Sequence, residues 1–511
     1  MQKTKEEQYK TVNKLVFKEL GIETQHEHIV FMRDDSHVCV SEGFEALTRV
    51  RLSKGKKSIV ASLNVITSNQ LLEEGEIGLS NSAQHALGVK NGDYIEVAHL
   101  SHVNSLSSVR SKIYGNKLDY RQMQSIIQDI VKGNYSNVHL SAFITACAGS
   151  NMEIDEITNL TQAMISTGEQ INWGTGPVVD KHCIGGLPGN RTTPIVVAVA
   201  AAAGLKIPKT SSRAITSPAG TADMMETMTP VDLSINEIKK IVSKEGGCIV
   251  WGGIANLSPA DDALIRVERA LDLDSEGQLV ASVLSKKVAA GSTHVLIDIP
   301  VGKTAKVRTE EQAEKLKYFF KVVGNAVDLE TKVLVTDGTQ PVGRGIGPAL
   351  EAMDVLSVLR NESDAPKDLK HRSILIAGEL LELSSRTESG KGMQLAEELI
   401  ISNKAYEKFM AICLAQGGFK EPEYASYKRN VFAQTAGIVG EIDNRKLANV
   451  AKLAGAPQDS SAGVLFEAPV GKKVKKGQTL FTVYAQSEGE LNYASSYLDS
   501  LDGSNIVSIV S

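Results

Sequence analysis

Apolar residues change their spacing along this 511-residue chain, and each spacing predicts a different kind of element. In the first 100 residues, short apolar runs alternate with turn residues, which is typical of β-strands. The strand candidates are Ile29–Met32, Val38–Val40, Ser58–Ser62 and Tyr94–Val97, and Ser82–Leu87 is a helix candidate. We therefore predict a small β-barrel-like domain over residues 1–100.

Helical spacing replaces this pattern between Tyr120 and Trp173. Apolar residues recur there every three or four positions, as on the buried face of a helix. The stripes are Met123, Ile126, Ile127 and Ile130, and then Ile157, Leu160 and Met164. We predict a helical domain over residues 101–175. Asp261 to Ala289 also reads as helix, and we expect the segment at about 261–290 to complete this domain.

Strand-like and helical runs then alternate from Pro177 to about Leu414, which is the mark of an α/β sheet with crossovers. Strand candidates are Val178–Val179, Cys248–Val250, Val295–Ile299 and Lys332–Val335, and helix candidates are Ile235–Ser243, Glu310–Val323 and Gly347–Val358. We predict an α/β domain with a mixed sheet over residues 176–415. Gly343–Gly347 is interpreted as a turn that opens a helix rather than as a phosphate loop.

After Tyr424 the composition becomes β-rich again, and we predict a C-terminal α+β domain over residues 424–511. The stretch Ala462–Phe481 has the hairpin pattern of a lipoyl-type barrel. No modifiable Lys stands at a hairpin tip flanked by Met, Ala or Asp, so the pattern favours a structural domain over a carrier. The whole chain thus belongs to the α/β fold class, with helical and α/β domains between two β-rich ones.

Composition and charge narrow the class of protein. The chain is 42% hydrophobic and 23% charged, with a net charge of -5, so a nucleic-acid scaffold is not expected. The five scattered cysteines form no C-x-x-C pair, which argues against a disulfide framework and a zinc site. The N-terminus lacks an apolar signal region, and the longest apolar run, Pro194–Leu205, is too short to span a bilayer. We expect a cytoplasmic protein with no membrane partner and no metal.

The strongest candidate for chemistry is the stretch Asp180–Thr193, a glycine-rich turn between a short strand and the helical run Pro194–Gly204. Such a turn leaves free backbone N–H groups near a helix N-terminus, which suits an anion. Lys181 and His182 stand at the end of the strand, where open α/β sheets place ligands. The turn matches neither a Walker loop nor a dinucleotide motif. Phosphate binding and a plain chain reversal both remain open from the turn alone.

Two further stretches carry suitable side chains. Lys209–Thr221 gathers hydroxyls and one arginine ahead of a helix, with Thr221 as the expected N-cap. Ser282 and Lys286 are four residues apart and so share one helical face. A capped loop and an exposed salt bridge are the structural alternatives.

Together these stretches resemble the thymidine/pyrimidine-nucleoside phosphorylase family from about Tyr120 to the C-terminus. The matching motifs are Asp180–Gly186, Ser211–Arg213 with Ala219–Thr221, Ser258–Asp262 and Ala281–Lys287. The first 100 residues resemble the extra N-terminal barrel of the family's long branch. That branch holds archaeal AMP phosphorylases and bacterial thymidine phosphorylase homologues.

The resemblance implies a fold of the nucleoside phosphorylase type and a phosphorolysis in which orthophosphate attacks the anomeric carbon as the base departs. It implies a homodimer or higher homo-oligomer and no cofactor beyond orthophosphate as co-substrate. By position, the phosphate ligands are Lys181, Gly186, Thr193, Ser211 and Thr221, whereas His182 faces the sugar and base, and Arg269, Ser282 and Lys286 hold the base carbonyls. A dianion requires such charges, hydroxyls and backbone donors.

Several residues depart from the short thymidine enzymes. Cys183 stands where those enzymes have a serine. A nucleophilic thiolate of Cys183 beside Lys181 is a minor alternative, because phosphorolysis needs no covalent step. The run 212–217 follows the AMP phosphorylase pattern instead. On that alternative, Asp274 donates a proton to the base, and the 5′-phosphate and base are bound by Ser212, Arg213, Ala214, Ile215, Thr216, Ser217 and Lys306.

We expect a pyrimidine nucleoside, thymidine above all, as the substrate, with nucleoside 5′-monophosphates as the alternative. A related fold transfers phosphoribosyl groups to anthranilate, but the diphosphate-binding signature and metal-binding acids of that reaction are missing. A non-catalytic carrier or interaction protein is a further alternative. The intact set Lys181, His182, Ser211, Thr221, Ser282 and Lys286 speaks against it.

Overall fold

The computed structural model describes residues 13–24, 27–214, 217–253, 257–271, 273, 275–501 and 506–510. The chain divides into two compact units. The first is Met1–Cys147 with Ala263–Leu271, and the second is Ala148–Asp262 with Asp272–Ser511. In the described ranges, no helix is both long and apolar enough to cross a membrane.

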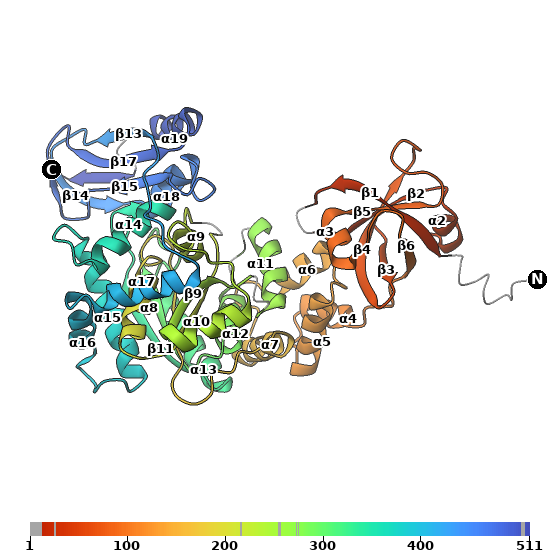
Figure 1. Cartoon of the computed structure of the whole chain (residues 1–511), viewed down its shortest axis with the longest axis horizontal. Helices are drawn as coiled ribbons and strands as arrows, with labels where there is room; N and C mark the ends of the chain where they lie inside the picture. The colour runs from red at the N-terminus through yellow and green to blue at the C-terminus, as the bar shows by residue number, and fades with distance from the viewer. Residues whose placement is uncertain are drawn as a thin grey trace, which may run out of the picture. The chain divides into compact units, whose positions relative to one another are not determined.

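The N-terminal strands of the first unit close into a barrel in the order β1-β5-β2-β4-β3-β6 (Figure 1). Its strands are β1 (Lys14–Ile22), β2 (Ile29–Arg33), β3 (Arg49–Lys54), β4 (Lys57–Ile66), β5 (Glu76–Ser80) and β6 (Tyr94–His99), with helices α2 (His37–Glu42) and α3 (Asn81–Leu87). Alternate strand residues such as Leu15, Phe17, Val50 and Leu52 are buried in its core, as the two-residue period of a strand requires. The predicted small barrel is confirmed.

One strand prediction in this region is wrong, because Val38–Val40 lies in helix α2. The hydroxyl of Ser36 accepts a hydrogen bond from the Cys39 backbone N–H at 3.2 Å and so caps the helix start. Gly43 ends the helix in the left-handed region at φ 64°. Serine and glycine at these positions outweigh the strand propensity of two valines, of which Val40 is exposed.

The predicted helical stripes are buried in helices of both units. In the first unit α4 (Leu106–Ile113) packs against α5 (Tyr120–Val131) and α6 (Asn137–Cys147), and in the second α7 (Ile154–Thr167) packs against α12 (Glu276–Ala289). Helix α11 (Pro259–Leu271) contributes residues to both units. The predicted segment Asp261–Ala289 is therefore two helices, because α11 ends at Leu271 and α12 begins at Glu276.

The second unit contains the predicted α/β domain. Strands β7 (Val179–Cys183), β10 (His294–Val301) and β11 (Glu330–Asp337) pair in parallel, as do β8 (Ile207–Ser211) and β9 (Gly247–Trp251). A parallel bridge between Val178 and Lys206 joins the two sets. The helices are α8 (Thr192–Ala202), α9 (Thr221–Glu226), α10 (Ile235–Glu245), α13 (Glu310–Ala326), α14 (Pro348–Leu359), α15 (Lys367–Leu383), α16 (Gly392–Ile401) and α17 (Lys404–Gln416). Gly347 caps α14, so the turn before it opens a helix as predicted.

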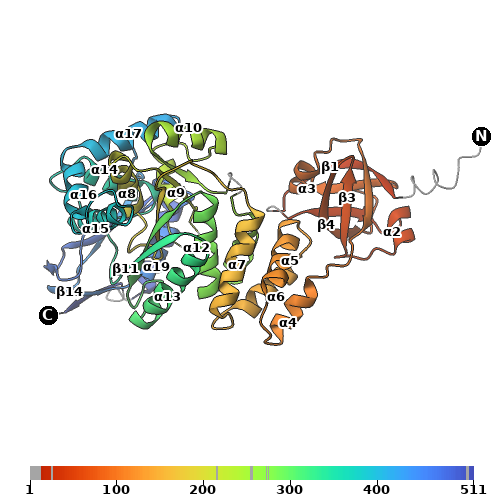
Figure 2. The ribbon, with the colours of Figure 1, turned by 90° about the horizontal axis from the view of Figure 1, so that it is seen from below.

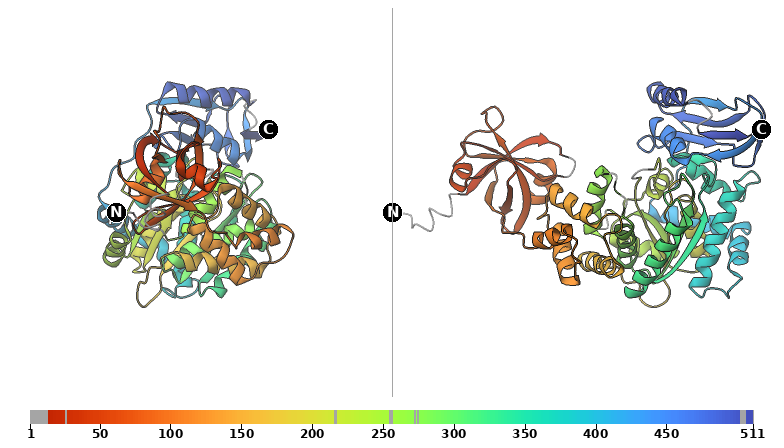
Figure 3. Two further views of the ribbon diagram at one scale, coloured as in Figure 1. Left: turned by 90° about the vertical axis from the view of Figure 1, so that its right-hand side faces the viewer. Right: turned by 180° about the vertical axis from the view of Figure 1, so that it is seen from behind.

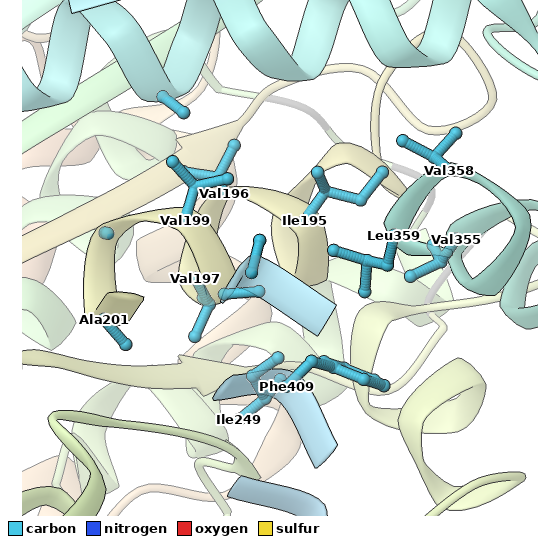
Figure 4. Close-up of a cluster of buried hydrophobic side chains, with 14 of the residues drawn as sticks. Ile195, Val196, Val197, Val199, Ala201, Ile249, Val355, Val358, Leu359 and Phe409 are labelled. Carbon is cyan, nitrogen blue, oxygen red and sulfur yellow. The ribbon is translucent and has the colours of Figure 1, made fainter. Parts of the chain in front are cut away.

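Helix α8 is the centre of this domain's hydrophobic core. Every residue from Thr192 to Ala201 is buried, which is expected of a helix that is apolar on all sides. Helices α14, α15, α16 and α17 pack around it (Figure 2). Side chains from α14, β9 and α17, among them Val355, Ile249 and Phe409, meet those of α8 in the core (Figure 4). The core thereby fixes the helix that follows the glycine-rich turn.

Replacing Phe409 by Ala should lower the free energy of unfolding of the α/β domain by about 3–5 kcal/mol. Phe409 is completely buried beside α8, so its truncation leaves a cavity that the rigid helices cannot close. Urea unfolding followed by circular dichroism measures the change. Phe432→Ala is the control, because Phe432 is 45% exposed. Equal losses in the two variants would contradict this description of the core.

The C-terminal part of the second unit is β-rich, as predicted (Figure 3). One sheet has the order β12-β15-β17-β13 and the other β16-β14-β18, both antiparallel. The elements are β12 (Gly345–Ile346), β13 (Tyr427–Phe432), β14 (Gly437–Ile442), α18 (Asn444–Leu453), β15 (Gly463–Phe466), β16 (Lys473–Val474), β17 (Thr479–Ala485), α19 (Glu488–Ser500) and β18 (Val507–Val510). Through β12, a turn of the α/β domain becomes an edge strand of the C-terminal sheet.

Candidate active site

Two of the predicted phosphate ligands, Lys181 and Ser211, lie toward the carboxyl ends of two neighbouring parallel strands. Lys181 and His182 belong to the last residues of β7, and Ser211 is the last residue of β8. Ligands in open parallel sheets bind at this edge, because the loops that follow the strands converge there. The topology therefore brings together two stretches that are about thirty residues apart in sequence.

Lys181 is a fully buried lysine whose amine contacts hydroxyls. Its Nζ donates to Thr192 Oγ1 at 2.7 Å and to Thr193 Oγ1 at 3.3 Å, at the start of α8. Among the described residues, no carboxylate lies within ion-pair distance of this amine. A buried cation without a contacting anion is costly, and a bound anion would compensate it. Lys181 and Thr193 are thus brought together as predicted.

The glycines of the turn allow its backbone to lie close to β10 and β7. Gly186 adopts the left-handed region at φ 58°. A Cβ on Gly185 would lie 2.7 Å from Pro300 Cγ, and one on Gly189 would lie 2.5 Å from Cys183 Sγ. Side chains at these two positions would push the turn away from the sheet. The glycines therefore set where the turn's backbone N–H groups lie.

The second stretch presents a hydroxyl that has no partner. Ser211 Oγ is buried, and it forms no hydrogen bond with any of the described residues. Asp223 of α9 holds the following segment, because its Oδ2 accepts from Ala214 N at 2.6 Å and Gly220 N at 2.9 Å. The unpartnered hydroxyl of Ser211 is consistent with a ligand-binding role.

Thr221 is not the N-cap that the sequence predicts. Gly220 occupies that position with extended backbone, and Thr221 is the first residue of α9. A Cβ on Gly220 would lie 2.6 Å from the carbonyl oxygen of Ser212, so only glycine fits where the chain turns into the helix. The carboxylate of Asp223, inside the first turn of the helix, accepts a hydrogen bond from the backbone N–H of Gly220 at 2.9 Å. The backbone N–H of Ala222 donates to the carbonyl oxygen of Ser212 at 3.4 Å, which joins the start of α9 to the segment that follows β8.

Arg213 is held by acidic neighbours. Its guanidinium contacts Glu226 at 2.5 and 2.9 Å and Asp232 at 3.5 Å, and it lies 4.9 Å from the centre of the Trp251 ring. The hydrogen bond with Glu226 raises the pKa of Arg213 and lowers the pKa of Glu226. This arginine could bind a 5′-phosphate only by giving up those partners.

Around this arginine, the run 212–217 is only partly described. Ser217 donates to the carbonyl oxygen of Ala219 at 2.8 Å, and Ser212 is exposed. Ile215 and Thr216 lie outside the described residues.

A buried aspartate between two lysines stands directly behind the turn. Asp180 is fully buried and pairs with Lys287 at 2.8 Å and Lys209 at 3.6 Å. Burial lowers the pKa of Lys209, and the positive charge of Lys287 lowers it further, whereas Asp180 raises it. One carboxylate thus contacts two lysines, and it is the only acid paired with either of them among the described residues.

His182 is kept neutral by these surroundings. Burial lowers its pKa well below the ordinary value, and the charges of Lys287, Lys209, Lys286 and Lys181 lower it further. A neutral imidazole can accept or donate a hydrogen bond at the sugar without adding a charge.

Lowering the pH should therefore destabilise the second unit. Below about pH 6.5 the unfolded chain protonates His182 and the folded chain does not, so stability falls with pH by at most about 1.4 kcal/mol per unit. Urea unfolding between about pH 5 and pH 7.5 measures this slope. The His182→Gln variant should show a shallower dependence of stability on pH. His28 and His139 in the first unit also have lowered pKa values, but they are present in both proteins, so the difference between the two slopes reports on His182. Identical slopes would contradict a depressed pKa for His182.

The predicted base-binding pair lies on one face of α12. Lys286 Nζ donates to Ser282 Oγ at 3.0 Å and to Asp261 Oδ2 at 2.7 Å. Asp261 is buried, and the Lys286 side chain is 29% exposed, so the ammonium group is oriented while still open to solvent. Lys286 therefore does form a salt bridge, as the structural alternative supposes, but its partner is a buried aspartate that positions the lysine.

Three predicted residues cannot be placed against this group. Arg269 is on α11, in the segment that belongs to the first unit, and its side chain is outside the described set. Asp274 also lies outside the described residues. Lys306 is exposed in the loop that follows β10.

Cys183 is a thiol held beside a carboxylate. Burial raises its pKa, and the neighbouring Asp298 raises it further, so it is not the reactive thiolate considered as an alternative. Asp298 is fully buried on β10, and its Oδ1 accepts from Thr336 Oγ1 at 2.6 Å. Sequence reasoning assigned no role to Asp298. A charged residue inside the apolar run Val295–Ile299 was the signal that could have revealed it.

Three family models match the chain. Residues 175–406 match the a/b domain of the glycosyl transferase family, and residues 107–168 match its helical bundle domain. Residues 438–500 match the pyrimidine nucleoside phosphorylase C-terminal domain.

Curated relatives cover almost the whole chain. A protein of Hahella chejuensis is 54% identical over 491 residues, which are 96% of this chain and 97% of that protein. One of Legionella pneumophila (strain Corby) is 56% identical over 485 residues, 95% of this chain and 94% of the relative. Both carry the name "Putative thymidine phosphorylase".

Among solved structures, anthranilate phosphoribosyltransferase from Thermus thermophilus has a TM-score of 0.51 and 18% identity. The match covers 60% of this chain and 99% of that one. This likeness supports the predicted fold of helical and α/β domains and says nothing of the reaction.

Proposed function

Because the chain belongs to the thymidine and pyrimidine-nucleoside phosphorylase family, we propose that it transfers the deoxyribosyl group of thymidine to orthophosphate. The products are thymine and 2-deoxy-ribose 1-phosphate. The observation that carries this proposal is the buried Lys181 amine, which contacts two hydroxyls and no carboxylate among the described residues. The neighbouring strand ends at Ser211, whose hydroxyl has no partner among those residues.

One group of residues binds orthophosphate, and another binds the nucleoside. Lys181, Thr193, Ser211 and the backbone of the turn at Gly186 hold orthophosphate, whose negative charge they offset. One phosphate oxygen forms a bond to C1′ of the sugar as the bond from C1′ to N1 of the base breaks. The bonding electrons go to the thymine ring, which then takes up a proton from solvent.

The departing base is stabilised by the pair on α12. Lys286 presents its ammonium group, and Ser282 its hydroxyl, to the base carbonyls, where negative charge develops. Asp261 fixes the orientation of the ammonium group. His182 faces the sugar as a neutral group, because the nearby lysines disfavour its protonation. Orthophosphate is the only co-reactant that this scheme requires, and we expect a homodimer or higher homo-oligomer.

Free nucleosides fit this site better than nucleoside 5′-monophosphates. In the monophosphate alternative Arg213 cradles the 5′-phosphate, but here Glu226 and Asp232 already occupy its guanidinium. A second dianion beside these carboxylates would be repelled. The preference for thymidine therefore rests on the surroundings of Arg213 and on the names of the relatives.

Base release from thymidine, uridine, AMP, CMP and UMP in the presence of orthophosphate tests the substrate. The proposal predicts release from thymidine at a higher kcat/KM than from any monophosphate. Release from monophosphates alone would overturn the choice of substrate and assign the run 212–217 and Lys306 to a 5′-phosphate. Release from none of the five would overturn the proposed reaction.

A further inference from the structure

The largest fully buried side chain of the described residues is an arginine in the glycine-rich turn. Arg191 stands directly before Thr192 and Thr193, the two hydroxyls that contact Lys181. Its own side chain is turned away from that amine, toward another loop. None of the roles considered above uses this arginine.

The guanidinium of Arg191 contacts one turn and the helix that follows it. Its Nη1 donates to the carbonyl oxygen of Gly345 and lies 3.7 Å from Asp354 Oδ2. Its Nη2 lies 3.6 Å from Glu351 Oε1. Both carboxylates are on α14 and are buried. A cation inside the protein is therefore matched to two acids and one carbonyl.

These groups also determine the shape of the turn at 343–347. Asp354 Oδ2 accepts from Arg344 N at 2.5 Å and from Gly345 N at 2.7 Å. Gly343 has φ 87°, and a Cβ there would lie 2.7 Å from Asp354 Oδ2 and 3.1 Å from Arg191 Cδ. The turn thus closes around the Arg191–Asp354 pair, and the glycine leaves room for it.

The same turn continues into the C-terminal sheet. The carbonyl oxygen of Leu187 in the glycine-rich turn accepts a hydrogen bond from Val342 N at 3.3 Å. Ile346 pairs with Val464 in β15, and Leu187 and Ile346 are part of the hydrophobic core of the C-terminal part. A continuous set of contacts therefore runs from the phosphate ligands to the C-terminal domain.

The positive charge of Arg191 is what allows Glu351 and Asp354 to be buried side by side. Burial raises the pKa of Glu351 to about 7, and the neighbouring Asp354 also raises it, whereas Arg191 lowers it. Without the guanidinium, Glu351 would lose its cationic partner, and Asp354 would keep only Arg344, whose Nε lies 3.6 Å from Asp354 Oδ1. The two acids would then take up a proton or separate, and either change would shift the turn.

We propose that Arg191 is a positioning residue for phosphate binding, whose guanidinium joins the glycine-rich turn to the turn at 343–347 and, through it, to the C-terminal domain. In this position Arg191 fixes the start of α8, so that Thr192 and Thr193 keep the Lys181 amine aimed at the anion. The inference rests on the proposed function in one respect, namely that orthophosphate binds at Lys181. The C-terminal domain is thereby part of the phosphate-binding apparatus.

Steady-state kinetics of Arg191→Lys and Arg191→Ala test this role in the full-length protein. A lost hydrogen-bonded charge should raise the KM for orthophosphate about ten- to a hundredfold, with the KM for the nucleoside unchanged. Millimolar guanidinium should restore phosphate affinity to Arg191→Ala, and urea, which has the same shape without the charge, should not. Arg360→Lys is the control, because Arg360 pairs with Glu421 at the surface, at the C-terminal end of α14. An unchanged KM for orthophosphate, or equal effects of guanidinium and urea, would overturn the proposal.

Hydrogen exchange on the unmodified protein gives a test that needs no variant to fold. Orthophosphate should slow exchange at the backbone N–H groups of Arg344 and Gly345, although they belong to a different loop from Lys181. Slowing confined to residues 181–193 would overturn the link. Slowing in neither loop would overturn the phosphate site itself, and with it the proposed function. The two failures are therefore distinguishable.

Discussion

Replacing Lys181 by Met will lower kcat/KM for orthophosphate by about 10³-fold, whereas the α/β domain stays folded. The amine contacts only Thr192 and Thr193 among the described residues, so methionine removes a charge without stranding a buried carboxylate. The two threonines can still donate to other groups, and the apolar chain of methionine fills the same space. The loss should appear in the KM for phosphate and in kcat, because the same charge acts on the transition state.

Initial rates measured over a range of phosphate concentrations give this number, and circular dichroism reports the fold. Lys240→Met on α10 is the matched control, because Lys240 is an exposed lysine that pairs with none of the predicted ligands. A Lys181→Met protein that is folded and keeps full phosphate-dependent activity would remove the assigned phosphate site.

The second large effect is expected on stability. Asp180→Asn should lower the free energy of unfolding of the α/β domain by about 3–5 kcal/mol at neutral pH. Asp180 is the carboxylate that contacts both Lys287 and Lys209, so the amide leaves two buried ammonium groups facing each other. The deficit should shrink as the pH rises, because burial lowers the pKa of Lys209 in the folded protein, which therefore loses this proton at a lower pH than the unfolded chain does.

Urea unfolding of both proteins at neutral and alkaline pH measures this deficit. Asp364→Asn is the control, because Asp364 is 76% exposed and lies 3.9 Å from Arg344. A loss no larger than that of Asp364→Asn, or one that grows with pH, would contradict the role of Asp180 as the counter-ion of the two lysines.

Local signals in the sequence predicted the glycine-rich turn and its flanking strand and helix well. Glycines in a row after a short strand left few alternatives to a strand–turn–helix unit, and the apolar run from Pro194 indicated a buried helix. The structure places Lys181 and Thr193 in contact, although they are twelve residues apart. The predictions were less accurate where one residue decides between two elements, as Ser36 does at α2 and Gly220 does at α9.

Long-range charge pairing was the part that sequence reasoning missed. The partners of the buried charges Arg191, Asp298 and Asp180 lie on other elements of the fold. For example, Arg191 pairs with Asp354, and Asp180 pairs with Lys287. No periodicity indicates such pairs. Asp298 interrupts an apolar run, but Arg191 lies among polar residues and Asp180 lies next to Lys181, so only Asp298 carries a visible signal in the sequence.

We propose that orthophosphate, bound at Lys181, is the group that cleaves the nucleoside. Incubating the unmodified protein with thymidine and increasing orthophosphate, while following thymine release and the phosphorus NMR spectrum, tests it most directly. We expect no thymine without orthophosphate, saturation with increasing phosphate, and one equivalent of a sugar 1-phosphate per thymine. Thymine release that does not depend on orthophosphate, or that yields free deoxyribose, would contradict it.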